Sequence, residues 1–198
     1  MPDKHFLCKV FSIVMIFTTS KTDQDLAQIL NLQKKNLAQS LSQEEINREG
    51  FVTVNHSFAG LKKMNSYEQS VIAKDNDTVI AYLLAMTQQS KYDIPILAPM
   101  FEIFNQIIYQ GRKISEYNYL VVGQVCVAKE FRGKGILDEC YSEYKKRFEK
   151  KYDFAITEIA QHNLRSMKAH ERIGFKTIHQ YRESNGTDWN IVVWDWRK

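Results

Sequence analysis

The sequence predicts an α/β (α+β) fold, in which a mixed, mostly antiparallel central sheet contains one β-α-β crossover and carries helices on both faces. Antiparallel pairing is indicated by two hairpin signals, at Asp75-Asn76-Asp77 and at Asn185-Gly186, each between apolar runs. A strand at 119–127, a helix from Ile136 and a strand at 153–160 then indicate the crossover. Parallel neighbours need such a connection, so these two strands are expected to be parallel.

The chain is expected to form a single domain over residues 1–198. It has 198 residues, of which 44% are hydrophobic and 12% aromatic, enough for a sizeable core. We find no repeat, low-complexity tract or Gly/Ser/Pro-rich linker that would mark a boundary.

The first element is the apolar run Phe6–Phe17. It is too short to span a bilayer, contains Lys9, and is followed by no small-residue cleavage site. A buried first strand therefore explains the run better than a membrane span or a signal peptide. Met15 is an alternative start, because the segment from Met15 onward reads as strand, turn and helix.

Capping signals place the next helices. Thr22 or Asp23 begins a helix that reaches about Asn36, and Ser42 with Glu45 three residues later forms a second start signal. After the first hairpin, a connection over Ser90–Glu116 contains the apolar stretch "MFEIFNQII". Connections of this length usually serve a function, so we expect it to shape a binding cleft.

The second half alternates strands and helices. Apolar residues recur at helical spacing from Ile136 to Phe148, and a second helix begins at Asn163 and stops at Gly174. The strands expected here are Tyr119–Val127, Asp153–Ala160, Lys176–Tyr181 and Trp189–Trp196.

Gly133 and Gly135 lie between a strand and a helix start, beside Arg132 and Lys134. Glycines there allow positive φ and a close approach to a ligand, and a helix start offers unpaired N–H groups. The segment therefore predicts an anion site suited to phosphate, with a plain charged turn as the alternative. It matches neither a Walker loop nor a dinucleotide fingerprint, which would need glycine where Asp138 stands.

Two segments in order, "VCVAKEFRGKGIL" and "NLRSMKAHERIGF", resemble motifs A and B of the GNAT superfamily of acyl-coenzyme A-dependent N-acyltransferases. The resemblance is strongest over residues 119–175, and it makes residues 88–117 an insertion on the acceptor side. It implies that the strand at 119–127 splays from the strand at 153–160, which frees backbone groups to bind the cosubstrate acetyl-CoA. The residues implied to bind it are Val125, Cys126, Val127, Arg132, Gly133, Lys134, Gly135, Ile136, Leu137, Asn163 and Ser166.

Two positions depart from the family pattern. Leu137 stands where motif A expects Gly or Ala, and His170 stands where motif B often has Tyr. The resemblance implies that His170 lies near the cofactor sulfur, where it could protonate the thiolate. The alternative is that His170 packs on the helix surface.

Glu158 is the best candidate for a base, because strand alternation puts it on the apolar face of Phe154 and Ile156, where its pKa would be raised. His162, or deprotonation through water, is the alternative. Cys126 is expected to be a buried structural residue rather than a nucleophile.

The resulting prediction is an N-acetyltransferase that moves the acetyl group of acetyl-CoA to a small-molecule amine or amino-acid derivative by direct attack. A catalytically silent acyl-CoA-binding module and a protein N-acetyltransferase are the alternatives. The net charge of +4 comes from interspersed residues, so neither a nucleic-acid nor a membrane partner is expected. Three cysteines without metal-ligand spacing predict a metal-free cytoplasmic protein, which could form a homodimer.

Overall fold

The structure is a computed structural model, and it describes residues 15–197. Most of the predicted first strand, with Cys8 and Lys9, lies outside the described residues. The described part is strand β1 (Met15–Thr19), which is an edge strand with Ile16 45% exposed. The prediction of a buried first strand is therefore wrong for this part, because β1 has a neighbour on one side only.

The central sheet has seven strands in the order β1-β2-β3-β6-β7-β9-β8. All neighbouring pairs are antiparallel except β6 with β7, which are parallel. The mixed, mostly antiparallel sheet with one crossover is therefore confirmed. Besides β1, its strands are β2 (Val71–Asp75), β3 (Thr78–Met86), β6 (Tyr119–Val127), β7 (Phe154–Ala160), β8 (Lys176–Arg182) and β9 (Asp188–Asp195).

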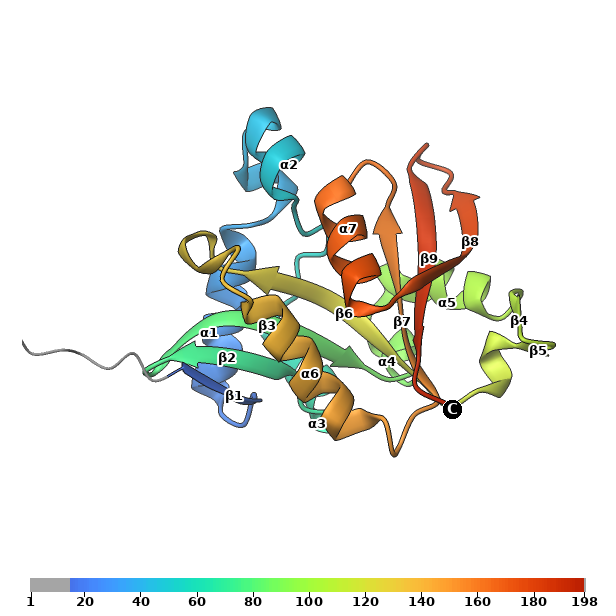
Figure 1. Ribbon diagram of the computed structural model, residues 1–198, viewed down its shortest axis with the longest axis horizontal. Helices are drawn as coiled ribbons and strands as arrows, with labels where there is room; N and C mark the ends of the chain where they lie inside the picture. The colour runs from blue at the N-terminus through green and yellow to red at the C-terminus, as the bar shows by residue number, and fades with distance from the viewer. Residues whose placement is uncertain (1–14, 198) are drawn as a thin grey trace, which may run out of the picture.

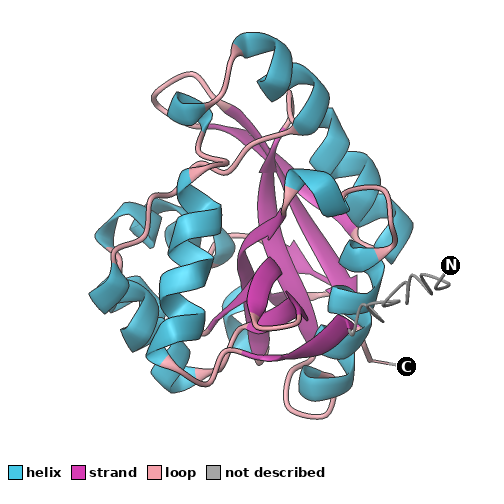
Figure 2. Cartoon of the chain, turned by 90° about the vertical axis from the view of Figure 1, so that its left-hand side faces the viewer, coloured by secondary structure: helices cyan, strands magenta, loops and turns pink. Residues whose placement is uncertain are grey.

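Helices cover both faces of this sheet (Figures 1 and 2). One face carries α1 (Asp23–Lys34) and α3 (Phe58–Tyr67), and the other carries α6 (Ile136–Phe148) and α7 (Leu164–Ile173). A short helix, α2 (Gln43–Glu49), stands above the end of the sheet where β6 and β7 finish (Figure 1). No helix among residues 15–197 is long and apolar enough to cross a membrane.

The predicted capping signals are confirmed. Thr22 and Ser42 each form a capping box, with Asp25 and Glu45 respectively, and the Asn163 side chain accepts a hydrogen bond from the Ser166 N–H. These contacts satisfy donors that a helix start would leave unpaired. Helix α3, which starts after Ser57, was not predicted.

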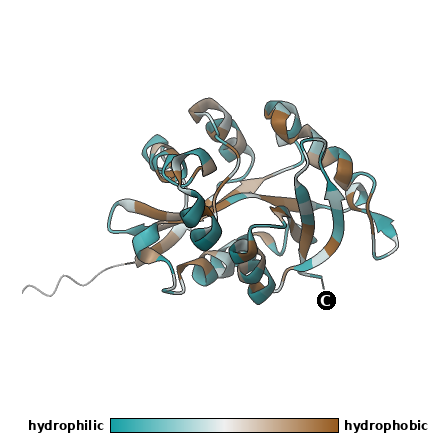
Figure 3. Ribbon diagram, turned by 90° about the horizontal axis from the view of Figure 1, so that it is seen from above, coloured by the Kyte–Doolittle hydropathy of each residue, from teal (hydrophilic) through white to brown (hydrophobic). Residues whose placement is uncertain are grey.

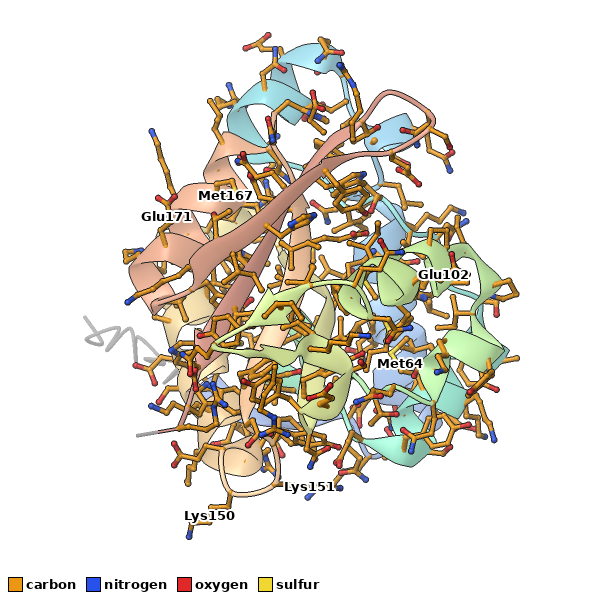
Figure 4. The ribbon with its side chains drawn as sticks, turned by 90° about the vertical axis from the view of Figure 1, so that its right-hand side faces the viewer. Met64, Glu102, Lys150, Lys151, Met167 and Glu171 are labelled. Atoms are coloured by element: carbon orange, nitrogen blue, oxygen red, sulfur yellow. The ribbon has the colours of Figure 1, made fainter. Side chains whose placement is uncertain are left out.

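The core lies between the sheet and its two helical layers, and the apolar strands run through the middle of Figure 3. Strand β3 is buried at every position after Thr78, with Tyr82, Leu83 and Leu84 fully buried. Because α1 covers one face of β3 and α6 the other, both sets of alternating side chains are apolar or hydrogen-bonded. Side chains outside this core point into solvent, as Lys150 and Glu171 do in Figure 4.

The long connection forms α4 (Ser90–Asp93), α5 (Ala98–Phe104) and a small hairpin, β4 (Ile108–Tyr109) with β5 (Arg112–Lys113). Some of its aromatic side chains face inward: Phe104 packs edge-on against Tyr119, and Tyr109 packs against Phe154, whereas Tyr92 is exposed. The connection therefore covers the beginnings of β6 and β7 because its apolar side chains are needed in the core. That residues 88–117 form an insertion on the acceptor side stays a prediction.

Candidate active site

Strands β6 and β7 pair only over their first residues, from Tyr119 opposite Phe154 to Val121 opposite Ile156. The Thr157 hydroxyl then donates to the Val122 carbonyl, over 2.8 Å, and beyond this point the strands diverge (Figure 1). The predicted splaying of the middle strands is therefore confirmed. An open stretch of strand leaves backbone donors and acceptors without a neighbour, which a ligand can pair with as an added strand.

The free backbone groups in this opening are the N–H and carbonyl of Val125 and the N–H of Val127, because the Val127 carbonyl accepts from the Arg132 guanidinium. The Ala128 N–H donates to the Ile80 carbonyl, and Cys126 stands opposite Tyr82 on β3. Hydrogen-bonded positions alternate along an antiparallel strand, so Cys126 directs its backbone groups to β3. Val125 and Val127 direct theirs into the opening. Of the three residues predicted here, Cys126 therefore offers no backbone group to a ligand.

The loop before α6 presents a row of N–H groups. Gly133 and Gly135 have φ of 74° and 78°, and a Cβ on either would meet no atom within 4 Å. Among residues 15–197, the N–H groups of Gly133 to Asp138 have no hydrogen-bond partner. Such a row at the start of a 13-residue helix carries partial positive charge and has room for a large anion. This arrangement fits the diphosphate of acetyl-CoA.

Arg132 has a different role from the one predicted. Its guanidinium donates to the Val127 carbonyl (2.9 Å), the Glu49 carboxylate (2.8 Å) and the Asn36 side chain (2.6 Å), and its N–H donates to the Lys129 carbonyl. The hydrogen bond from Arg132 lowers the pKa of Glu49. Arg132 therefore ties the loop to the segment after α1 and to α2, and three of the five N–H groups of its guanidinium, together with its backbone N–H, are engaged.

A cleft of about 620 Å³, called the main cleft below, lies between this loop, the end of β6 and helix α7. Three cations of α7, Arg165, Lys168 and Arg172, line it at spacings that place them on one helical face. Arg172 bonds Asp138, over 2.5 Å, and Arg165 bonds Glu49, over 3.2 Å, so two of these charges are partly compensated. Lys134 lies over the Phe131 ring and Leu137 packs partly against the core while lining the cleft.

The segment after α2 covers the opening. Gly50, with φ of 72°, turns the chain, and the Asn163 amide donates to the Phe51 carbonyl over 3.4 Å. The Phe51 ring stacks on His162, with 5.3 Å between ring centroids. Asn163 therefore holds this segment as well as capping α7, a role that the motif resemblance did not predict.

A second, smaller cavity of about 90 Å³, called the small pocket below, opens on the other side of the split. The residues that line both cavities are Phe51, Val52, Val125, Asn163, Ser166 and His170. A ligand in the main cleft and one in the small pocket would therefore meet at Val125. This geometry suits transfer of a group between two bound molecules.

Glu158 lines the small pocket, as its predicted role as a base requires. Burial raises its pKa to about 7, a hydrogen bond from the Tyr181 hydroxyl (2.6 Å) opposes this rise, and the charge of Glu183 adds to it. The predicted rise in pKa is confirmed, but the partner is a tyrosine rather than the Lys or Arg of an ordinary surface ion pair. A carboxyl group that titrates near neutral pH is well suited to exchanging protons with a substrate.

His170 is buried, with 2% of its surface exposed. Its Nδ1 lies 2.8 Å from the Ser166 carbonyl oxygen, which accepts only, so Nδ1 carries the proton. Its Nε2 therefore accepts from the Tyr141 hydroxyl, over 2.6 Å. Burial lowers the pKa of His170 to about 4, so the ring is neutral and its one proton is engaged. This geometry favours a structural role, and the acid role stays a prediction.

The H170F substitution distinguishes these two roles. If His170 only joins α6 to α7, we expect the free energy of unfolding to fall by about 1–3 kcal/mol, because the Tyr141 hydroxyl loses its partner inside the core. The pH dependence of kcat should stay as in the wild type. Y141F is the matched control, because it breaks the same hydrogen bond and should have a similar effect. A loss of kcat in H170F far beyond that in Y141F would show that His170 supplies the proton.

Burial also decides the role of Cys126. Cys126 and Cys140 are buried free thiols, and burial raises the pKa of each to about 12, so Cys126 is a poor nucleophile at neutral pH. Within residues 15–197, no cluster of three or more His, Cys, Asp or Glu side chains could hold a metal ion.

Sequence reasoning missed several residues of the site. The basic face of α7 could have been found, since Arg165, Lys168 and Arg172 recur at helical spacing after a helix start. Nothing in the sequence marks Phe51 to Thr53 or Tyr181, because their contacts come from segments far away in the chain.

The chain was compared with known proteins. The family model described as "Acetyltransferase (GNAT) family" matches residues 29–175. We found no significant match among curated proteins.

Solved structures share the fold at low sequence identity. The ribosomal-protein-S18-alanine N-acetyltransferase from Escherichia coli superimposes with a TM-score of 0.59 and 11% identity, covering 93% of this chain and 96% of that one. The putative acetyltransferase yncA from Salmonella typhimurium, solved with its cofactor acetyl-CoA, gives 0.57 and 14%, covering 93% and 95%. An N-acetyltransferase from Staphylococcus aureus Mu50 gives 0.60 and 14%, covering 93% and 99%.

The family match spans most of the chain, and the fold, the β6–β7 opening and the glycine loop agree with it. The chain belongs to the acetyltransferase (GNAT) family and is an acyltransferase with acetyl-CoA as its cosubstrate.

Proposed function

We propose that the protein is an N-acetyltransferase that transfers the acetyl group of acetyl-CoA directly to the amine of a small molecule or an amino-acid derivative. The observation that carries this proposal is the shared wall of the two cavities at Val125. The small pocket, of about 90 Å³, has room for the reacting end of an amine but not for a folded protein surface. We also propose the cytoplasm as its location.

The proposed mechanism assigns one task to each group that faces the opening. Acetyl-CoA supplies an acetyl thioester in the main cleft. The N–H groups of Gly133 to Asp138 bind its diphosphate, and the backbone groups of Val125 and the N–H of Val127 pair with the amides of its arm. A backbone N–H in the opening, at Val125 or Val127, donates to the carbonyl oxygen as negative charge develops on it.

Glu158 receives the proton that the amine must lose. Substrate amines are mostly protonated at neutral pH, so Glu158 as a carboxylate binds the ammonium and takes one proton from it. The amine nitrogen then forms the bond to the acetyl carbon while the carbon–sulfur bond breaks. The nitrogen passes its second proton to the departing thiolate, so the products are the amide and the free thiol, which leaves into the solvent-open main cleft beside the positive charges of α7.

Calorimetry followed by a turnover assay tests the proposal on the full 198-residue chain. We expect heat of binding with both acetyl-CoA and CoA, and release of free thiol from acetyl-CoA when a primary amine is added. Absence of heat with both compounds would overturn the cofactor site. Binding without thiol release on any amine would instead indicate a binding module without turnover.

A further inference from the structure

Gln124, on β6, holds its side-chain amide in one orientation. The His56 N–H donates to Gln33 Oε1 over 2.9 Å, so the Nε2 of Gln33 faces Gln124 and donates to its Oε1, also over 2.9 Å. The Nε2 of Gln124 then donates to the Val54 carbonyl over 2.8 Å. This series of hydrogen bonds starts at a backbone donor and ends at a backbone acceptor. The oxygen and nitrogen of each side-chain amide therefore cannot exchange places. The Tyr82 hydroxyl adds a bond of 2.6 Å to Gln124 Oε1.

The second N–H of Gln124 has no hydrogen-bond partner among residues 15–197, and the side chain lines the small pocket. The oxygen of this amide accepts two hydrogen bonds, from Gln33 and from Tyr82. The group that Gln124 offers to a ligand in the pocket is therefore a hydrogen-bond donor and not an acceptor. Burying a polar N–H without a partner is costly, which makes this N–H a preferred contact for an oxygen atom of a bound molecule.

Gln124 and Glu158 project from the same face of the sheet. Val121 pairs with Ile156, and Glu158 follows Ile156 by two residues, so all three share a face. Gln124 lies three residues after Val121, which simple alternation would place on the opposite face. The β6 register against β3 shifts in between, because Gly123 and Gln124 together stand opposite Leu84, and this bulge returns Gln124 to the face of Glu158.

The two cavities differ in charge. No Lys or Arg of the described chain lines the small pocket, whose only ionisable groups are Glu158 and the neutral His170. The main cleft, by contrast, is lined by four basic residues, Arg132, Arg165, Lys168 and Arg172. A carboxylate bound in the small pocket would therefore face the Glu158 carboxylate without a cation to balance it, which is unfavourable in a partly buried site.

We propose that Gln124 and Glu158 together select an acceptor that has a primary amine next to a neutral carbonyl oxygen, as in an amino-acid amide, over a free amino acid. The inference rests on the proposed function. Glu158 binds the amine and accepts its proton, while the free N–H of Gln124 donates to the carbonyl oxygen. A free amino acid would place its carboxylate between these two groups and be repelled by Glu158.

Three small amines that share the unit N–C–CH3 test the selection: alaninamide, ethylamine and alanine. Ethylamine lacks the carbonyl group, and alanine carries a carboxylate in place of the amide. We measure thiol release from acetyl-CoA by the full-length protein. We expect kcat/KM for alaninamide to exceed that for ethylamine by about tenfold, as one hydrogen bond to a fixed donor provides. We expect alanine to be lower than alaninamide by at least about 100-fold. Alanine as good as alaninamide would overturn the acceptor class and leave the proposed function intact.

The Q124M variant tests the residue itself. It removes the donor, so the ratio of alaninamide to ethylamine should fall about tenfold from its wild-type value. Y82F is the matched control, because it disturbs the same network but leaves Gln124 held by Gln33 and Val54, so it should keep the wild-type ratio. A wild-type ratio in Q124M would overturn the role of Gln124. If Q124M does not fold, the wild-type comparison of the three amines still decides the acceptor class. Binding of acetyl-CoA with no thiol release on any of the three would overturn the class and the proposed function together.

Discussion

Replacing Glu158 with glutamine is expected to lower kcat by about 10²- to 10⁴-fold, the usual contribution of a positioned base. Burial raises the pKa of Glu158 to about 7, and a base must be ionised to accept a proton. The wild-type rate should therefore rise with pH up to about 7 and become level above it. The E158Q variant should lack this rise. The measurement is kcat and kcat/KM from about pH 5 to about pH 9 with a primary amine.

The Y181F variant is the control for this assignment. The Tyr181 hydroxyl donates to Glu158 Oε2 over 2.6 Å and favours the ionised form, so its removal should raise the pKa of Glu158 further. We expect Y181F to keep activity but to shift the rise in rate to higher pH. If E158Q keeps the wild-type pH profile, the amine loses its proton to water and Glu158 is not the base.

Replacing Gly135 with glutamate is expected to weaken acetyl-CoA binding by at least about 100-fold, or about 2.7 kcal/mol. Gly135 has φ of 78° and stands immediately before α6, so its side chain would emerge among the free N–H groups of Gly133 to Asp138. A carboxylate there competes for these donors and repels the diphosphate. Calorimetric titration of acetyl-CoA into the G135E protein measures the effect.

Two variants separate charge from backbone strain. Gly111 has φ of 82° and, like Gly135, could carry a Cβ that meets no atom within 4 Å, but it lies in the β4–β5 turn outside the main cleft. G111E should therefore cost similar stability and leave the affinity for acetyl-CoA unchanged. G135A adds the strain without the charge and should weaken binding much less than G135E. Equal affinities of G135E and wild type would show that the loop does not hold the diphosphate.

The parts of the site that could be predicted from sequence are local. The positive φ of Gly133 and Gly135 and the capping by Asn163 follow from residues within a few positions of each other. The crossover between β6 and β7 also follows from element order. Glu158 could be placed on an apolar face from strand alternation alone.

Predictions that needed long-range contacts were less successful. Arg132 was expected to add charge for phosphate, but Glu49 and Asn36, which are 83 and 96 residues away in sequence, engage its guanidinium. His170 lines both cavities and its predicted acid role stays a prediction, but the hydrogen bond from Tyr141 on the preceding helix was not predicted. The connection at 88–117 has an apolar sequence that suits a binding wall or a core equally, and packing against Tyr119 and Phe154 brings part of it into the core.

The sequence by itself therefore determined the order of strands and helices from β6 to β9, the glycine loop before α6 and the family, because glycine conformation, helix capping and strand periodicity are properties of neighbouring residues. Only the tertiary structure decided which side chains are free to act. The bulge that brings Gln124 to the face of Glu158, and the hydrogen bonds that engage Arg132 and His170, depend on segments that meet only when the sheet is assembled.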